Sequence, residues 1–329
     1  MSSPVEIAVV RDAAPAAAAW RAVVAAARAA DLPGVPAPVR EEVLAGLRGD
    51  AHAGGRMPPA WAATGAEGEV TAVAGVRPST SPGPARTAAD LQLYVHPAAR
   101  RRGTGTLLLA AVAGAAREDG WAALRAAVPA CTPGDVFCLR HGFVRERVVH
   151  HLLLPLAEVH RAWLAELVYA DHPGYRLTTW YTPAIPAPAR IGFALAGPEE
   201  SGGFAVVVPG LVFGSAATVV GSGWGWLLRV GALDAGTGAV VGYTEVFIPP
   251  APAVRAQHCR VVVVPVHRRR GLGRWVTAEL LRRLRAEYPR ISEVETVAAD
   301  GDAAVLALGE EFGFRAYRRT HDYRLRLPG

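Results

Sequence analysis

The sequence contains no lysine and no asparagine, so arginine supplies all 35 of its basic residues. Both missing amino acids are encoded by A-rich codons, whereas alanine, glycine, proline and arginine are abundant, and a GC-rich genome accounts for this bias. A formal net charge of +6 is the kind of excess that attracts nucleic acids. Because the genome explains the composition, we expect no nucleic-acid partner.

Cysteine is also scarce. The three cysteines, Cys131, Cys138 and Cys259, form no CxxC pair and have no histidines at metal-ligand spacing. This pattern argues against a disulfide scaffold and against a zinc site, so we expect no metal and a reducing cytoplasm. The first residues, MSSPVEIAVVRD, lack the basic-then-apolar order of a signal peptide.

Charge is absent from Ser201 to Leu228, a stretch long enough to cross a bilayer. Its many glycines, Pro209 and its high valine content favour strands over a membrane helix. We therefore expect no membrane span and no membrane partner.

Strand and helix patterns alternate along a chain of 329 residues, which is too long for one ordinary core and suits two domains. The predicted strands are 5–10, 70–76, 91–95, 123–128, 146–154, 176–181, 227–233, 240–248, 255–264, 291–298 and 315–325. The predicted helices are 15–30, 40–47, 104–118, 133–140, 157–169, 272–287 and 302–312. The second half repeats the order at the end of the first, which predicts duplicated α/β domains with mixed sheets.

One residue pattern occurs twice, each time between a strand and a helix. Its first copy is Arg100, Arg101, Arg102, Gly103, Thr104, Gly105 and Thr106, and its second copy is Arg268, Arg269, Arg270, Gly271, Leu272, Gly273 and Arg274. Backbone N–H groups ahead of a helix N-terminus bind anions, glycines let the backbone approach a diphosphate, and arginines add phosphate contacts. A single copy is compatible with a plain basic turn. Two copies favour a pyrophosphate-binding loop, and neither the Rossmann glycine spacing nor the Walker lysine is present.

These segments resemble motif A of the GNAT superfamily of N-acetyltransferases, Q/R-x-x-G-x-G/A after the fourth strand. Each copy is followed, as in a GNAT domain, by a short helix, a Gly-Phe pair (Gly142-Phe143 and Gly313-Phe314) and a strand. The resemblance implies an α/β fold of two tandem GNAT-like domains, each a mixed central sheet flanked by helices. We expect domains at 1–155 and 176–329, joined by a connecting helix and turn at 156–175. Tandem acetyltransferases of GC-rich bacteria, mycothiol synthase among them, share this architecture.

The resemblance also implies acetyl-CoA as the acyl donor, with no metal. The two loops, from Arg100 to Thr106 and from Arg268 to Arg274, would bind its pyrophosphate. Val95 and Val264 would hold the pantetheine arm through their backbone groups.

Acetyl transfer to an amine needs a base and often an acid for the leaving thiolate. The superfamily's usual acid, a tyrosine four residues before the Gly-Phe pair, is replaced by Cys138 and by Gly309. Cys138 is a substitute acid, a covalent nucleophile or a small buried residue.

For the base, the first half offers Asp90 and Gln92 near its fourth strand, and the second half offers Glu245, which shares a strand face with Tyr243. Glu245 is either activated by apolar neighbours or a solvated carboxylate on an edge strand. His258 and Tyr317 are lesser candidates. By resemblance to tandem enzymes, we expect catalysis in the second half.

In a GNAT domain two helices form the acceptor wall where this chain has the Gly- and Val-rich segment Pro186–Trp226. That segment is either a rebuilt apolar wall or an error in the gene. The leading function is N-acetyl transfer to a small-molecule or protein amine, and the alternative is a non-catalytic acyl-CoA-binding or sensing protein. The sequence does not indicate the oligomeric state.

Overall fold

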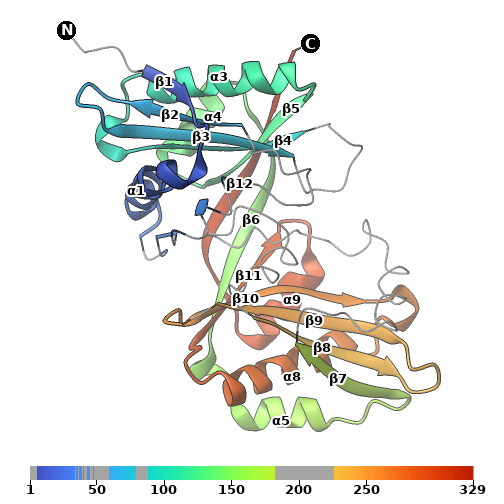
Figure 1. The fold of residues 1–329 in the computed structure, drawn as a ribbon. Coiled ribbons are helices and arrows are strands. Elements are labelled where there is room, and N and C mark those ends of the chain that lie inside the picture. Colours follow the sequence, from blue (N-terminus) through green and yellow to red (C-terminus); the bar gives the residue numbers. More distant parts are fainter. Residues whose placement is uncertain are drawn as a thin grey trace. The chain divides into compact units, whose positions relative to one another are not determined.

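The computed structural model describes residues 6–33, 59–78, 88–181, 226–249 and 251–328, with a few single positions between 34 and 48. The chain forms two compact units (Figure 1). Among the described residues, those up to Val148 and those from Thr320 onward make the first unit, and Val149 to Arg319 make the second.

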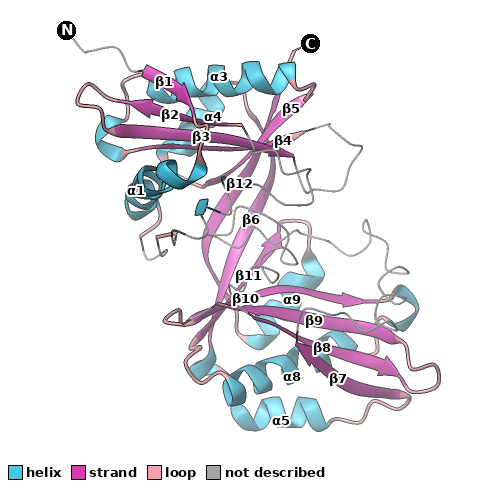
Figure 2. Ribbon diagram, viewed as in Figure 1, coloured by secondary structure: helices cyan, strands magenta, loops and turns pink. Residues whose placement is uncertain are grey.

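The first unit is a sheet with helices on both faces (Figure 2). Its strands pair in the order β1 (Glu6–Val9), β2 (Ala60–Thr64), β3 (Val70–Pro78), β4 (Ala89–Val95), β5 (Ala123–Pro129) and the end of β12 (Arg315–Arg326). Its helices are α1 (Ala13–Asp31), α3 (Thr104–Glu118) and α4 (Pro133–Arg140). Alternate residues of β3 face opposite sides, so Ala72 and Ala74 pack in the core with α3 while Val73 packs with α1.

The second unit repeats this plan. Its strands pair in the order β6 (Val144–Pro155), β11 (Glu293–Ala299), β10 (Arg255–Val263), β9 (Val240–Ile248), β8 (Trp226–Asp234) and β7 (Tyr175–Tyr181). Its helices are α5 (Arg161–Tyr169), α8 (Leu272–Glu287) and α9 (Ala303–Phe312). The apolar side of α8, which includes Val276, Leu280 and Leu284, packs with Leu228 and Val230 of β8. β10 pairs with β11 in parallel, as β4 does with β5.

Two strands divide between the units. Thr320–Arg326 of β12 pair with Ala123–Pro129 of β5, so the end of the chain belongs to the first unit. Residues 149–155 of β6 pair with Glu293–Ala299 of β11 in the second unit. The expected domains 1–155 and 176–329 follow chain order, whereas the observed units exchange the residues of their last strands.

Asp135 of α4 ties this exchanged strand to the first unit. Its Oδ1 accepts a hydrogen bond from the Tyr323 hydroxyl at 2.6 Å and lies 2.7 Å from His321 Nδ1. Burial on its own raises the pKa of Asp135, but the hydrogen bonds from Tyr323 and His321 outweigh it and lower that pKa. Tyr323 is 1% exposed and the Asp135 side chain is 14% exposed, so these bonds lie at the edge of the core.

Replacing Tyr323 by phenylalanine should lower the free energy of unfolding by about 1–3 kcal/mol, because the partly buried carboxylate of Asp135 loses a donor. Since the folded pKa of Asp135 is lowered, this contribution is present above the unfolded pKa and disappears as the pH falls through the folded pKa. Urea unfolding of Tyr323→Phe at neutral and acidic pH measures it, with the exposed Tyr169→Phe as control. Equal losses in both variants at neutral pH would contradict this role.

The sequence predictions for the α/β class and for most elements are confirmed, and several bounds agree to the residue. Two differ. β2 was not expected, since its residues Ala60–Thr64 include a single β-branched residue. The helix expected at 157–169 begins only at Arg161, after a 3-10 turn at Leu156–Glu158.

Part of the prediction falls where the structure gives no description. Half of the positions of the expected helix at 40–47, and all but the last residue of Pro186–Trp226, lie outside the described residues. Among the described helices, none combines the length and apolar character needed to cross a membrane.

Candidate functional site

The first predicted loop makes an abrupt entry into α3. β4 ends at Val95, a 3-10 turn covers Pro97–Ala99, and Gly103 is the N-cap of the helix. Arg101 and Gly103 have positive φ angles of 64° and 83°. Arg100 Nε donates to the Val95 carbonyl at 3.2 Å, which closes the loop onto the end of its strand.

The second loop follows the same path. β10 ends at Val263, a 3-10 turn covers Pro265–His267, and Gly271 is the N-cap of α8. Arg269 and Gly271 have φ angles of 60° and 75°. Arg268 Nε donates to the Val263 carbonyl at 3.0 Å. The repeated sequence therefore specifies a repeated backbone conformation.

This equivalence changes the residue matched to Val95. The counterpart of Val95 is Val263, because each is the last residue of its strand and accepts from the arginine five positions later. Val264, which we expected in this place, donates its N–H to the Val241 carbonyl at 2.8 Å, as His96 does to Thr71. Val263 is therefore the better placed of the two for a backbone contact with an extended ligand.

The two glycine positions of each loop require glycine for different reasons. At Gly103 no described atom lies within 4 Å of the point that a β-carbon would occupy, and a φ of +83° disfavours any side chain. At Gly105 a β-carbon would lie 3.3 Å from Phe137 and 3.5 Å from Val95, so this glycine lets α3 approach β4. Gly273 does the same in α8, 3.4 Å from Val261. At Gly271 a β-carbon would lie 3.3 Å from His172 Cε1, so the second loop is less open at this point than the first.

The parallel strands beside each loop separate soon after they begin. β4 pairs with β5 through Ala89 and Asp90, and β10 pairs with β11 through Arg255–Gln257. Beyond these residues, the described register links neither pair of strands. Backbone groups on one side of β4 and β10 therefore lack a strand partner and suit an extended ligand with amide groups.

Several arginines assigned to phosphate have protein partners. Arg100 makes a bidentate ion pair with Asp31 of α1, both N–O distances being 2.7 Å. Arg270 donates to the Tyr175 hydroxyl at 2.9 Å, and Arg274 Nε lies 2.6 Å from Glu311. Arg101, Arg102 and Arg269 are exposed, and so is Arg268, whose Nε donates to the Val263 carbonyl. The candidate anion site is therefore the backbone ahead of each helix, edged by exposed guanidinium groups.

The other loop residues contribute through their backbone or not at all. Thr104 and Leu272, the first residues of α3 and α8, are 2% exposed, so their side chains belong to the core. Thr106 is exposed, and its hydroxyl lies 3.2 Å from His141 Nε2.

A comparison with known families identifies the family to which both loops belong. The model of the acetyltransferase (GNAT) family matches residues 36–143 and 223–314, and each match contains one of the loops. The chain belongs to the GNAT family. The tandem GNAT resemblance drawn from the sequence is thereby confirmed.

Solved GNAT structures share the fold over the whole chain. A tandem GNAT protein from the clavulanic acid biosynthesis pathway has a TM-score of 0.76 and 23% identity, covering 99% of both chains. A GCN5-related N-acetyltransferase from Sphaerobacter thermophilus has a TM-score of 0.70 and 17% identity, covering 98% of this chain and 96% of that one. A search of curated proteins finds no match. These structures show that the chain has the tandem GNAT fold.

Glu245 lies in the middle of the second sheet between two arginines. The register places Arg229 of β8 and Arg260 of β10 opposite it. Arg229 Nε donates to Oε2 at 2.9 Å, and Arg260 Nε lies 2.9 Å from Oε1. Glu245 is 3% exposed and its strand is interior, so neither the solvated edge strand nor the apolar surroundings that we expected are observed. The two guanidinium groups supply the opposite charge that a buried carboxylate requires.

Tyr243 is two residues before Glu245 on the same face of β9. It packs with Trp180 and Val240 in a small apolar cluster. Burial raises the pKa of the Tyr243 hydroxyl to about 12. This tyrosine therefore stays protonated at neutral pH and can act as a hydrogen-bond donor.

The candidates of the first half have less suitable surroundings. Asp90 lies opposite Arg77 of β3 and Arg125 of β5 in the sheet register. Cys138 is 4% exposed in the core between α4 and α3, and burial raises the pKa of its thiol to about 12. A thiol with so high a pKa is a weak proton donor, so the structure favours the buried-residue interpretation of Cys138.

Thiol labelling should separate the three cysteines. Cys131 is exposed, whereas Cys138 and Cys259 are buried with thiol pKa values raised by burial to about 12. Their thiolate fraction should be lower than that of a free thiol by about a thousandfold. An Ellman titration of the folded chain should therefore show one fast thiol, and two more after denaturation. Two fast thiols, one of them lost in Cys138→Ala, would show that Cys138 is reactive.

A β-bulge distinguishes the second half from the first. The register of β9 and β10 shifts between His258 and Arg260, so Cys259 is an extra residue. The register of β3 and β4 runs without a shift from Ala72 to Pro78. Bulges re-aim backbone groups and are enriched next to active sites. This difference could not be read from the sequence.

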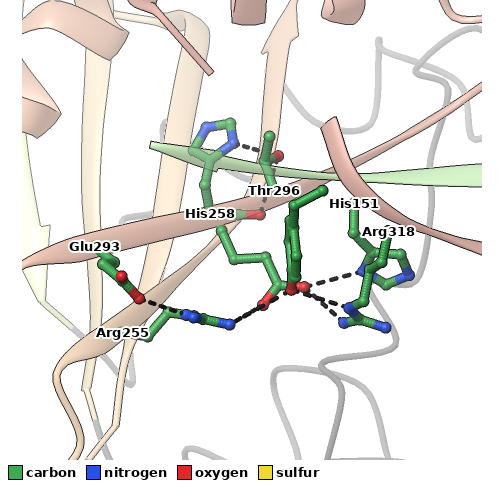
Figure 3. A network of polar contacts seen from close by, with 8 residues as sticks. His151, Arg255, His258, Glu293, Thr296 and Arg318 are labelled. Atoms are coloured by element: carbon green, nitrogen blue, oxygen red, sulfur yellow. Dashed lines mark hydrogen bonds and ion pairs between the residues drawn. The ribbon is translucent and has the colours of Figure 1, made fainter. Parts of the chain in front are cut away.

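A buried polar network lies on β11 of the second unit (Figure 3). Glu295 is 4% exposed and accepts from Arg318 at 2.7 Å, while its Oε1 lies 2.9 Å from His151 Nδ1. Arg255 bridges the network to Glu293 at 2.8 Å. Burial opposes ionisation of Glu295, but its contacts with His151 and Arg318 lower its pKa below the usual value. The network holds strands together at the point where β10 and β11 begin to separate.

The two lesser candidates have structural partners. His258 lies between Thr244 and Thr296, at 2.8 and 3.0 Å, and burial lowers its pKa to about 4. The Tyr317 hydroxyl accepts from Arg318 at 2.9 Å. Arg229 and Arg260 were not predicted as site residues, although Arg229 is the one charged residue from Trp226 to Leu233 and Arg260 is the one from Ala256 to Val263.

Proposed function

We propose that the chain is an N-acetyltransferase that moves an acetyl group from acetyl-CoA to a primary amine of a small molecule or protein. The observation that carries this proposal is the repeated loop, in which a glycine with positive φ caps a helix beside two separating parallel strands. That geometry provides backbone N–H groups for a pyrophosphate and unpaired strand edges for an amide-containing arm. No metal is needed for this reaction, and the three free thiols suit the reducing cytoplasm.

We assign the acetyl transfer to the second half. There a bulge at Cys259 lies beside Glu245, Arg260 and Tyr243. In the first half the positions matching Arg260 and Glu245 are Gln92 and Gly75, which have no ionisable group. Glu245 would take the proton of the attacking amine, and backbone groups near the bulge would stabilise the developing oxyanion. The first half would then bind acyl-CoA without performing chemistry.

Release of the CoA thiol across a panel of primary amines tests the proposal. We expect acetyl-CoA turnover that requires an amine and that forms an acetylated amine detectable by mass spectrometry. The absence of a tyrosine at Cys138 and Gly309 favours a second candidate, a non-catalytic acyl-CoA-binding protein. Binding of acetyl-CoA without turnover of any amine would establish that candidate instead.

A further inference from the structure

Three buried donors on one face of the second sheet have no partner. They are Trp180 Nε1 of β7, Arg229 Nη1 of β8 and Gln257 Nε2 of β10, none of which is hydrogen-bonded in the described structure. Their residues are 8%, 7% and 4% exposed. A fourth buried group without a hydrogen bond, Arg260 Nε, has Glu245 as its ion-pair partner. Each unpaired buried donor costs about 1–3 kcal/mol, so native proteins rarely keep them without a ligand or water.

The donors lie around Glu245. Trp180, Arg229, Glu245 and Arg260 are successive cross-strand partners on β7 to β10 and therefore share one face of the sheet. Gln257 lies opposite Phe247, two residues beyond Glu245 on the same face. All three free groups are N–H donors, so they match a ligand with acceptor oxygens.

The charge of this row selects the kind of oxygen ligand. Two guanidinium groups and one carboxylate leave one net positive charge on Arg229, Glu245 and Arg260. A carboxylate would offset the positive charge on the Arg229 side of the row, whereas a water would satisfy a donor without adding charge. An ammonium group on the same ligand would lie against the negative charge of Glu245, so an amino carboxylate matches both signs.

The Trp180 ring packs closely against β8 at one end of this row. A β-carbon at Gly231 would lie 2.8 Å from the Trp180 ring, so the glycine lets the indole lie flat on β8. Tyr243 packs beside the ring. At the other end of the row, Arg260 has 40% of its side chain exposed and marks the solvent side.

We propose that the acyl acceptor is an amino carboxylate whose carboxylate binds Trp180 Nε1 and Arg229 Nη1 while its amine lies toward Glu245. Glu245 uses one contact on each oxygen for the arginines, and an ionised carboxylate has further acceptor capacity for an ammonium group. This inference rests on the proposed acetyl transfer and names its substrate class.

Paired substrates test the carboxylate. Amino acids and dipeptides are compared with the amines or methyl esters that lack the free carboxylate, using thiol release and kcat/KM. We expect the best carboxylate to exceed its neutral counterpart at least about tenfold, mainly through KM, as one charge-assisted hydrogen bond would give. If every carboxylate is matched or exceeded by its neutral counterpart, the inference is wrong.

Variants test the residues. Trp180→Phe keeps the ring on Gly231 but removes the donor, and Arg229→Lys keeps the charge but changes the donor geometry. Each should reduce the carboxylate preference at least about fivefold. Trp226→Phe, at a tryptophan 57% exposed on β8, should keep it. Arg229→Lys can also destabilise the sheet, so the Trp180→Phe variant decides. If Trp180→Phe keeps the full preference for carboxylate substrates, the assignment is wrong.

A binding assay separates this inference from the proposed function. The N-acetyl derivatives of the same amino acids and amines are compared for stabilisation of the chain against thermal unfolding. Selective stabilisation by the carboxylates without any acetyl transfer would refute the transferase but keep the site. Acetyl transfer without carboxylate preference would keep the transferase and refute the site.

Discussion

A glutamate in place of Gly271 is expected to abolish acetyl transfer, whereas a glutamate in place of Gly103 is expected to leave most of the turnover. Both glycines are N-caps with positive φ, of 75° and 83°, so a side chain is strained at both. A β-carbon at Gly271 would also lie 3.3 Å from His172 Cε1, whereas no described atom lies within 4 Å of the same point at Gly103. The new carboxylate would occupy the anion site and repel a pyrophosphate. Losing two charge-assisted hydrogen bonds of about 1.5–3 kcal/mol each lowers acetyl-CoA affinity at least about a hundredfold.

Strain alone must be separated from this effect. Gly238 in the β8–β9 turn also has a positive φ, of 69°, and no described atom within 4 Å of the point that a β-carbon would occupy. Gly238→Glu therefore introduces a comparable strain and charge into the same unit, away from the loop, and should keep its turnover. If Gly103→Glu is inactive and Gly271→Glu is active, the chemistry belongs to the first half.

Glutamine at Glu245 should lower turnover at least about tenfold while acetyl-CoA affinity stays unchanged, because a general base typically contributes 10²–10⁴. The variant should also lose about 3 kcal/mol of stability, since Arg229 and Arg260 would face a neutral amide. The acidic limb of the pH–rate profile should disappear with the carboxylate. A profile that keeps its shape would assign Glu245 a structural role only.

Glu279 provides the matched control. It is a 3% exposed carboxylate of α8 that bridges Arg282 and Arg283, with N–O distances of 2.6 Å to each. Glu279→Gln removes the same kind of ion pair and leaves the face of β9 that carries Glu245 unchanged. It should be destabilised to a similar degree and should retain the acidic limb.

Local pattern was sufficient to predict the loops and most of the elements. Gly103 and Gly271 are required by backbone geometry at helix starts, and this requirement repeats in the sequence wherever the geometry repeats. The helices α3 and α8 likewise follow from their apolar periodicity, and their bounds agree with the structure. The match of Val95 to Val264 was one residue off because spacing alone does not show where a strand ends.

Long-range pairing was not predictable. That Thr320–Arg326 complete the sheet of the first unit depends on which strand edge they meet, which periodicity does not encode. The prediction for the surroundings of Glu245 was wrong for the same reason, since its neighbours Arg229 and Arg260 lie on other strands. The bulge at Cys259 is a property of the register between two strands and leaves no mark in one strand's sequence.

Calorimetric titration of the whole chain with acetyl-CoA tests most directly whether both loops are acyl-CoA sites. The account predicts two equivalents bound by the native chain, and one equivalent by Gly103→Glu and by Gly271→Glu. A native stoichiometry below two, or two equivalents retained by either variant, would contradict it.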